Sequence, residues 1–155
     1  MYKLHVEREI ACSHRLNLHE GKCFNLHGHN YKVIVDIKCS TIQDCGGASS
    51  DGMLLDFGTI KNIVDELDHK HLNEFFEVKA SSTAVDKSKS VNLYKSLAIQ
   101  PTSERLCLYF ATEILNQVYA TYEPYNFKEN FETGIRVRMY ESTNNYAEYS
   151  SNYYK

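Results

Sequence analysis

The sequence predicts an α+β fold, in which a four-stranded antiparallel sheet carries two helices on one face. Two apolar stripes of helical period lie in the middle of the chain, and segments that alternate apolar and polar residues lie on either side of them. A period of two is typical of strands buried on one face, whereas apolar residues at i, i+3, i+4 and i+7 indicate an amphipathic helix. Because the helices lie between two pairs of strands, we expect them to cover one face of a shared sheet.

The strands are predicted over residues 2–10 and 31–38, and again over residues 134–140 and 146–149. In each segment apolar side chains alternate with polar or charged ones over most of its length. Such alternation places one row of side chains in the core and the other outside it. The connection between the first two strands contains histidines and a cysteine, and connections held on a rigid scaffold often carry functional residues.

Residues 53–55 are predicted to form a short strand. One helix is predicted after this strand, and the other after Pro101. Asp56 is placed to cap the first helix, and Thr102 the second, with Glu104 in its first turn. The apolar stripes at the helical spacing are Ile60, Ile63, Val64 and Leu67 in the first helix, and Leu106, Phe110, Ile114 and Val118 in the second. Residues 77–100 show no sustained period, so they are expected to form a long surface excursion.

The composition is that of one soluble globular domain spanning residues 1–155. Hydrophobic residues make up 43% of the chain and charged residues 24%. No apolar run approaches the roughly 20 residues that cross a bilayer, and no signal-peptide pattern opens the sequence, so we expect no membrane association. The net charge of −3 and the lack of Lys/Arg runs argue against nucleic acid as a partner.

Five cysteines occur without any Cys-x-x-Cys pair, at positions 12, 23, 39, 45 and 107. An odd number cannot pair completely within one chain, and unpaired thiols are typical of reducing compartments. We therefore expect a cytoplasmic protein with reduced cysteines.

A metal site is predicted from His27, His29 and His14. If the His27-Gly28-His29 run continues into the strand that follows, the period of two sends both imidazoles to one side. His14, at the end of the first strand-like segment, is the best candidate for a third ligand. A catalytic Zn²⁺ usually has three protein ligands and one open position. An isolated His-x-His is more often a surface pair, but His14 and the nearby Cys23 favour the metal site.

Several motifs along the chain resemble those of the 6-pyruvoyltetrahydropterin synthases and 6-carboxytetrahydropterin synthases. They occur in the family's order and extend over nearly the whole chain. The matching residues are His14-Arg15-Leu16, the Cys-x-x-x-His-Gly-His run at 23–29, Asp56-Phe57, Leu67-Asp68-His69 with Leu72-Asn73, Pro101-Thr102-Ser103-Glu104 and Tyr140-Glu141. The resemblance implies the tunnelling fold (T-fold), in which subunits join their sheets into a barrel and usually stack as two trimers.

The resemblance also implies the roles of several residues toward 7,8-dihydroneopterin triphosphate. Cys23 matches the family's catalytic base, and a cysteine thiolate is favoured close to a cation. Asp68 and His69 match a second acid/base pair, although Asp-His at a helix end is more often structural. Glu141 matches the carboxylate that holds the pterin ring, where a strand-end Glu is otherwise usually exposed.

Four further residues are weaker candidates. Thr102 and Glu104 line the pterin pocket in the family, but here they are equally explained as helix-capping residues. Arg15 and Lys22 are the candidates for the triphosphate, because each adjoins a metal-binding or catalytic position. Basic residues of this kind are otherwise ordinary solvated surface.

Details of the motifs favour the carboxy branch of the family, which releases acetaldehyde on the path to queuosine. Leu26 and the runs at 72–75 and 101–104 are similar to this branch, whereas Lys32-Val33 and Asn144-Asn145 are closer to the pyruvoyl branch on the path to tetrahydrobiopterin. A folate-related branch fits least, because Cys23 is present. It stays an alternative because Glu20 lies close to Cys23 in the sequence. An alternative from another class is a non-catalytic, zinc-stabilised pterin-binding protein.

Overall fold

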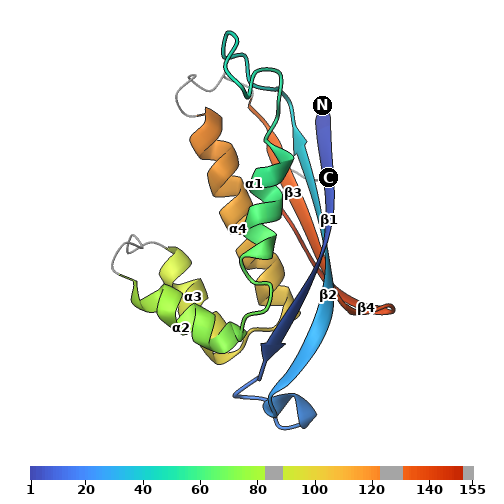
Figure 1. Ribbon diagram of the computed structural model, residues 1–155, viewed down its shortest axis with the longest axis vertical. Coiled ribbons are helices and arrows are strands. Elements are labelled where there is room, and N and C mark those ends of the chain that lie inside the picture. Colours follow the sequence, from blue (N-terminus) through green and yellow to red (C-terminus); the bar gives the residue numbers. More distant parts are fainter. Residues whose placement is uncertain (83–88, 123–130, 152–155) are drawn as a thin grey trace.

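A computed structural model describes residues 1–82, 89–122 and 131–151. It contains one antiparallel sheet in the order β1-β2-β3-β4, with the helices on one face (Figure 1). The strands are β1 (Tyr2–His14), β2 (His27–Cys39), β3 (Thr133–Ser142) and β4 (Asn145–Ser150); the helices are the short 3-10 helix η1 (Lys22–Phe24), α1 (Phe57–Asp65), α2 (Leu72–Ser81), α3 (Lys89–Ile99) and α4 (Ser103–Tyr122). The predicted α+β fold and its antiparallel sheet are confirmed.

The first two strands form a long hairpin that positions the histidines. They pair from Tyr2 opposite Cys39 to His14 opposite His27. Because β2 begins at His27 and not at residue 31, His27 and His29 belong to a strand and not to the preceding connection. Side chains two residues apart in a strand point to the same face, so both imidazoles lie on one side of the sheet.

That side of the sheet is the one the helices cover. Even-numbered residues of β1 and odd-numbered residues of β2 and β3 point toward the helices, and Ile10, Tyr31 and Val137 on these rows are fully buried. Helices α1 and α4 pack directly on this face, while none of the described helices lies on the opposite face (Figure 1). The side chains at the ends of the core rows therefore lie between the sheet and the helix layer.

Both predicted helix caps are present. The Asp56 side chain accepts a hydrogen bond from the Gly58 N–H at the start of α1, and Thr102 Oγ1 accepts one from the Arg105 N–H over 3.4 Å at the start of α4. These bonds satisfy backbone donors that have no partner within the helix. Helix α1 ends earlier than expected, at Asp65, and a turn carries the chain through residues 66–69.

Two segments were predicted wrongly. Residues 53–55 form no strand; Leu54 and Leu55 enter the core from an irregular segment, 3% and 6% exposed. The predicted surface excursion at 77–100 instead contains the end of α2 and all of α3, which pack against each other, while residues 83–88 lie outside the described part. The described residues thus form four α-helices and not two. Each of α2 and α3 buries only a few side chains, so the sequence has no long apolar stripe that would indicate these helices.

The segment that follows α1 lies along the outer edge of β1. His69 donates its backbone N–H to the Ala11 carbonyl over 2.7 Å, and Ser13 donates to the Lys70 carbonyl over 3.0 Å. These bonds cover the last part of an edge strand whose backbone groups would otherwise be unpaired. Among the described residues, no helix is long and apolar enough to cross a membrane.

Candidate active site

Three histidines converge at one end of the sheet, on its helix-covered side. His14 is the last residue of β1, and His27 and His29 are the first and third residues of β2. One ligand nitrogen from each ring lies within 4.8 Å of the others. His14 is 2% exposed, whereas His27 and His29 are partly open. The strand register therefore brings together the three imidazoles that the sequence singled out.

Backbone carbonyls fix the tautomers of two of these rings. His14 Nδ1 lies 2.9 Å from the Pro101 carbonyl oxygen, and His27 Nδ1 lies 2.7 Å from that of Asn25. A carbonyl can only accept, so each Nδ1 carries the proton, and each neutral ring presents a lone pair at Nε2. The two Nε2 atoms are 3.2 Å apart. Two lone pairs facing each other at this distance repel, so the arrangement favours a cation between them.

That cation is more easily a metal ion than a proton. Burial lowers the pKa of His14 and of His29, although the Glu141 carboxylate acts in the opposite direction on both. The neutral imidazole favoured by burial is the form that binds metal. In the parts of the chain that the structure describes, this is the one group of His, Cys, Asp or Glu side chains with such a geometry. The donor set fits a divalent ion, with the Nδ1 bonds holding the rings in place.

A pocket of about 290 Å³ lies at the start of α4, directly after Pro101, whose carbonyl bonds to His14. It is lined by the start of α4, the end of β3, the first residues of β4 and Leu16. All three residues predicted to bind substrate, Thr102, Glu104 and Glu141, lie on its wall. The structure thus groups these residues in one place, although they come from two separate elements.

Glu141 reaches this pocket from the end of β3, where it continues the row of odd-numbered residues that face the helices. The β3–β4 register shifts between Tyr140 and Ser142, on either side of Glu141. The Ser103 hydroxyl donates to Glu141 Oε1 over 2.5 Å. No other side chain or backbone group among the described residues donates to this carboxylate, which leaves Oε2 for a ligand. A charged acceptor of this kind suits two adjacent N–H donors of a planar ring.

Tyr31 lies beside two of the histidines, His14 and His29. Its ring is fully buried, and its hydroxyl is 3.4 Å from His14 Nε2. Burial, together with the nearby Glu141 carboxylate, raises the pKa of Tyr31, so that the hydroxyl stays protonated. It is therefore a permanent donor inside the site.

The family model for 6-pyruvoyl tetrahydropterin synthase matches residues 3–152 of this sequence. The chain belongs to this family. A relative from Pyrococcus horikoshii, named putative 6-carboxy-5,6,7,8-tetrahydropterin synthase, is 31% identical over 94% of this chain and 88% of its own length. The 6-carboxy-5,6,7,8-tetrahydropterin synthase of Haemophilus influenzae is 26% identical over 96% of this chain and 99% of its own. These names imply an enzyme of the tetrahydropterin synthase type.

Solved structures agree on the fold. A 6-pyruvoyl tetrahydropterin synthase from Plasmodium vivax superposes with a TM-score of 0.56 at 19% identity, covering 97% of this chain and 98% of that one. The enzyme from Caenorhabditis elegans gives a TM-score of 0.51 at 22% identity, with 98% of each chain covered. The chain therefore has the T-fold of this synthase family, as the sequence predicted.

Cys23 lies on η1, in the connection between the first two strands. Its side chain is partly exposed, and its backbone carbonyl accepts the Leu16 N–H over 2.8 Å, which ties η1 to the residues after His14. The thiol is close enough to the buried Tyr31 hydroxyl to influence it electrostatically. Arg15 and Lys22 are exposed and lie outside the pocket of Glu141.

Asp68 and His69 contact each other at the outer edge of β1. Asp68 Oδ2 lies 2.9 Å from His69 Nδ1, and Asp68 Oδ1 accepts the Ala11 N–H over 2.8 Å. The bond from Ala11, followed by that from His69, lowers the pKa of Asp68. His69 has a positive φ of 57°, an uncommon conformation for a residue other than glycine that often occurs at functional sites. Its side chain is 83% exposed, so the imidazole faces solvent.

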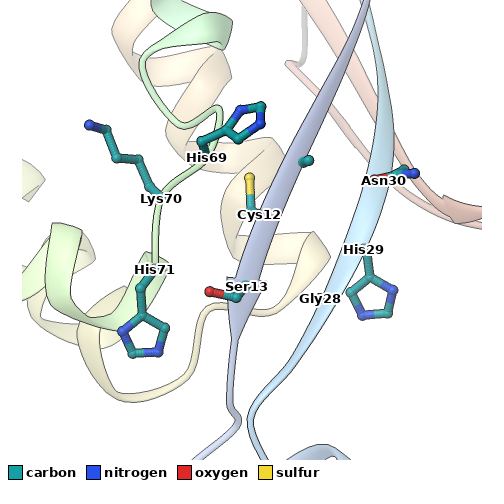
Figure 2. Close-up of a pocket in the computed structure, with 9 residues that line it drawn as sticks. Cys12, Ser13, Gly28, His29, Asn30, His69, Lys70 and His71 are labelled. Atoms are coloured by element: carbon teal, nitrogen blue, oxygen red, sulfur yellow. The ribbon is translucent and has the colours of Figure 1, made fainter.

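A hollow of about 580 Å³ passes across this part of β1, and both His29 and His69 line it (Figure 2). Cys23 does not line it, and within the described residues no hydrogen bond or ion pair joins Cys23 to Asp68 or His69. A single chain therefore brings the metal-binding group close to the glutamate pocket, but it leaves Cys23 and the Asp68–His69 pair without direct contact.

Sequence reasoning gave no role to two residues of this site. Ser103 was quoted only within a motif, and Tyr31 only as the start of a strand. The signal for Tyr31 is its position two residues after His29, on the same face of β2, and the signal for Ser103 is its place beside Thr102 at the first turn of α4. Neither position has a distinctive spacing, and the contact of Ser103 with Glu141 depends on how α4 packs against β3.

Proposed function

We propose that this protein converts 7,8-dihydroneopterin triphosphate to 6-carboxy-5,6,7,8-tetrahydropterin, with release of acetaldehyde and triphosphate, on the path to queuosine. The observation that carries the proposal is the placement of Glu141, whose carboxylate faces a pocket and acts electrostatically on the two metal-binding candidates His14 and His29. The names of the Pyrococcus and Haemophilus relatives support the carboxy branch.

Some residues of the site bind the pterin ring or the metal ion, and others transfer protons. Glu141 accepts two hydrogen bonds from the ring N–H and amino group of the pterin, while Thr102 and Glu104 shape the pocket around it. His14, His27 and His29 hold a divalent ion, for which we propose Zn²⁺. When bound, this ion polarises oxygen atoms of the substrate side chain and makes neighbouring protons more acidic.

We assign proton transfer to Cys23 and to the Asp68–His69 pair. A substrate side chain that extends from the ring pocket toward the histidines brings its carbon-bound hydrogens to the η1 side, where Cys23 removes a proton as general base. Asp68 orients His69 and stabilises its protonated form, as a carboxylate does in a catalytic triad. His69 then serves as the second acid/base group.

Product analysis tests this proposal. Zinc-loaded protein is mixed with dihydroneopterin triphosphate, and acetaldehyde, free triphosphate and the pterin product are quantified, with Cys23→Ala as the inactive control. Stoichiometric acetaldehyde is the expected result. Triphosphate release without acetaldehyde would instead assign the protein to the pyruvoyl branch, and bound but unchanged substrate would leave only a pterin-binding role.

We also propose a cytoplasmic homo-oligomer, a hexamer of two trimers. Support comes from the helix-free face of the sheet and from β4, an edge strand with exposed Tyr146. Tyr149 is partly buried, whereas Tyr153 and Tyr154, also expected at such contacts, lie outside the described residues. Light scattering on the active protein is expected to give the mass of six chains, and a fully active monomer would contradict the assembly.

A further inference from the structure

The connection between β1 and β2, which carries Cys23, is not held in place by packing. None of residues 15–26 is buried, and the apolar side chains of Leu18, Phe24 and Leu26 are 73%, 53% and 63% exposed. A segment without core contacts opens easily unless other interactions hold it. The position of the Cys23 thiol therefore depends on the hydrogen bonds that tie this connection to the rest of the protein.

Asn73 forms a buried attachment point for this connection. It is the second residue of α2 and is only 7% exposed. Its amide oxygen accepts the Arg15 N–H over 3.0 Å, and its amide nitrogen donates to the Arg15 carbonyl over 3.0 Å and to the Ala98 carbonyl over 2.9 Å. One side chain thus binds both backbone groups of Arg15 and links them to the end of α3.

The three partners also fix the orientation of the Asn73 amide. Two of them are carbonyls, which only accept, and the third is an N–H, which only donates. Turning the amide by half a rotation would place its oxygen against both carbonyls and its nitrogen against the Arg15 N–H, so all three bonds would be lost. Asparagine is therefore required for its two donors as well as for its acceptor.

Arg15 stands between the metal-binding group and the segment that carries Cys23. His14 precedes it, and Leu16, which follows it, donates its N–H to the Cys23 carbonyl over 2.8 Å. The path from Asn73 to Cys23 therefore consists of the backbone of two adjacent residues, with hydrogen bonds at each end. A side chain of α2 is in this way connected to the base proposed on η1.

The other attachments of the connection are single bonds. Asn17 donates its N–H to the Ile99 carbonyl over 3.2 Å, and Leu18 donates to the side-chain oxygen of Gln100 over 3.0 Å at the surface. Water replaces an exposed hydrogen bond at a small net cost, whereas a buried group left without its partner costs more. Because Asn73 is buried and supplies two bonds to one residue, its loss should loosen the connection more than the loss of either single bond.

We propose that Asn73 is a positioning residue that holds the connection carrying Cys23 fixed relative to the metal-binding group. The inference rests on the proposed function, because it takes Cys23 as the general base. A base acts only within hydrogen-bonding reach of the proton that it removes, and a misplacement of about 1 Å can cost roughly 10²-fold in rate. Asn73 does not line the pocket of Glu141, so it should affect proton transfer and not recognition of the ring.

Two substitutions test the Asn73 side chain. Asn73→Asp preserves the shape and the acceptor for the Arg15 N–H, but it places a carboxylate without donors against two carbonyls. An acidic residue in the first turn of a helix suits the helix dipole, so α2 should still form. Asn73→Leu is the second variant, which has a similar volume and removes all three bonds without adding a charge.

For both variants, we expect kcat to fall by about tenfold to 10²-fold in zinc-loaded protein. The affinity for a pterin that has no side chain at carbon 6 should stay at the wild-type value, as should the zinc content. Amide hydrogen exchange in residues 16–26 should become roughly tenfold faster, the factor that two lost hydrogen bonds are together worth. A merely structural role would lower stability without separating kcat from ring affinity in this way.

Tyr122→Phe is the matched control. Tyr122 is 5% exposed, and its hydroxyl lies 3.3 Å from the Thr41 carbonyl oxygen and 3.2 Å from that of Leu54. The control therefore removes a buried donor shared by two backbone carbonyls, as Asn73→Asp does, but Tyr122 lines neither the pocket of Glu141 nor the hollow at His69. It should keep the wild-type kcat and the wild-type exchange in residues 16–26.

Several results would overturn the positioning role while leaving the proposed function intact. They are a wild-type kcat or unchanged exchange in a folded Asn73 variant, ring affinity that falls together with kcat, and an equal loss of kcat in Tyr122→Phe. If zinc-loaded wild type forms no product from dihydroneopterin triphosphate, the proposed function itself is wrong, and the inference fails with it.

Discussion

The thiol of Cys12 donates a hydrogen bond to the backbone carbonyl of Leu67, with the sulfur 3.0 Å from the oxygen. Cys12 lies directly opposite His29 in the sheet, on the same face as the metal-binding group, so its position alone would make it a rival to Cys23. Burial raises the pKa of Cys12 to about 12, and the Asp68 carboxylate acts in the same direction. A thiol that is covered, hydrogen-bonded and difficult to ionise is a structural group, not a base.

The two cysteines should therefore respond oppositely to replacement by alanine. Cys23→Ala is expected to keep its fold and metal content while losing about 10²–10⁴-fold in turnover, the usual contribution of a positioned base. Cys12→Ala should retain activity per folded molecule and lose about 1 kcal/mol of unfolding free energy, as is typical when a buried contact is removed. Steady-state kinetics and thermal unfolding of both variants distinguish these outcomes. Normal turnover in Cys23→Ala would rule out its catalytic role.

Metal binding is predicted to depend on His27. Its Nε2 faces that of His14, so His27→Ala removes one of three ligands and leaves a site that binds divalent metal weakly. Elemental analysis after dialysis should show one metal ion per chain in the wild type and almost none in the variant. His19→Ala is the control, since His19 is an exposed histidine in the connection between β1 and β2. Equal metal content in His27→Ala would mean that the imidazoles do not form the site.

Glu141 is expected to recognise substrate without holding metal. Loss of one partner in a buried, charged hydrogen bond typically costs roughly 2–5 kcal/mol, so Glu141→Ala should weaken the binding of an unreactive pterin severely. Its zinc content should equal that of the wild type. Glu148→Gln is a suitable control, because Glu148 pairs with Arg138 on neighbouring strands and does not line the pocket. Unchanged affinity in Glu141→Ala, measured by calorimetry, would show that the pocket binds something else.

Local sequence was sufficient for the four strands of the sheet, the helix caps and the grouping of the histidines, although it also predicted a strand at residues 53–55 that does not form. The alternation around Val33 fixed which side of β2 faces the core, and once β2 is extended back to His27 the same alternation places His27 and His29 on that side. Asp56 and Thr102 were recognisable because a cap needs only a side chain and the next few backbone N–H groups. In each case the deciding interaction lies within a few residues of the chain.

Features that depend on distant contacts were beyond sequence reasoning. Helix α3 buries Tyr94 and Leu97 against α2 and α4, and these two residues alone give no helical stripe. The link between Ser103 and Glu141 joins residues 38 positions apart and exists only because α4 packs against β3. These long-range contacts shape the substrate pocket, whereas the metal-binding group follows from one hairpin.

A last prediction concerns Asp36, which lies on the helix-free face of the sheet with only 2% of its surface exposed. Three cationic or potentially cationic side chains surround it: Lys3 at 3.3 Å, His5 at 2.8 Å and Arg136 at 3.0 Å. Burial by itself would raise the pKa of Asp36, but the hydrogen bonds from His5, Arg136 and Lys3 outweigh burial and lower the pKa to about 2. A pKa below the usual 3.8 means that the folded state binds this proton less readily than the unfolded chain does.

The ionised carboxylate therefore stabilises the fold above about pH 4, and this contribution is lost as the pH falls toward 2. The difference between the two pKa values corresponds to about 2 kcal/mol of unfolding free energy. Denaturant unfolding at a series of pH values should show this loss in the wild type and in Asp44→Asn, a control at an exposed carboxylate. Asp36→Asn should be less stable at neutral pH but should lose about 2 kcal/mol less than the wild type across the acid range. If all three proteins lost stability in parallel between pH 4 and 2, the ion pairs around Asp36 would not contribute to the acid sensitivity of the fold.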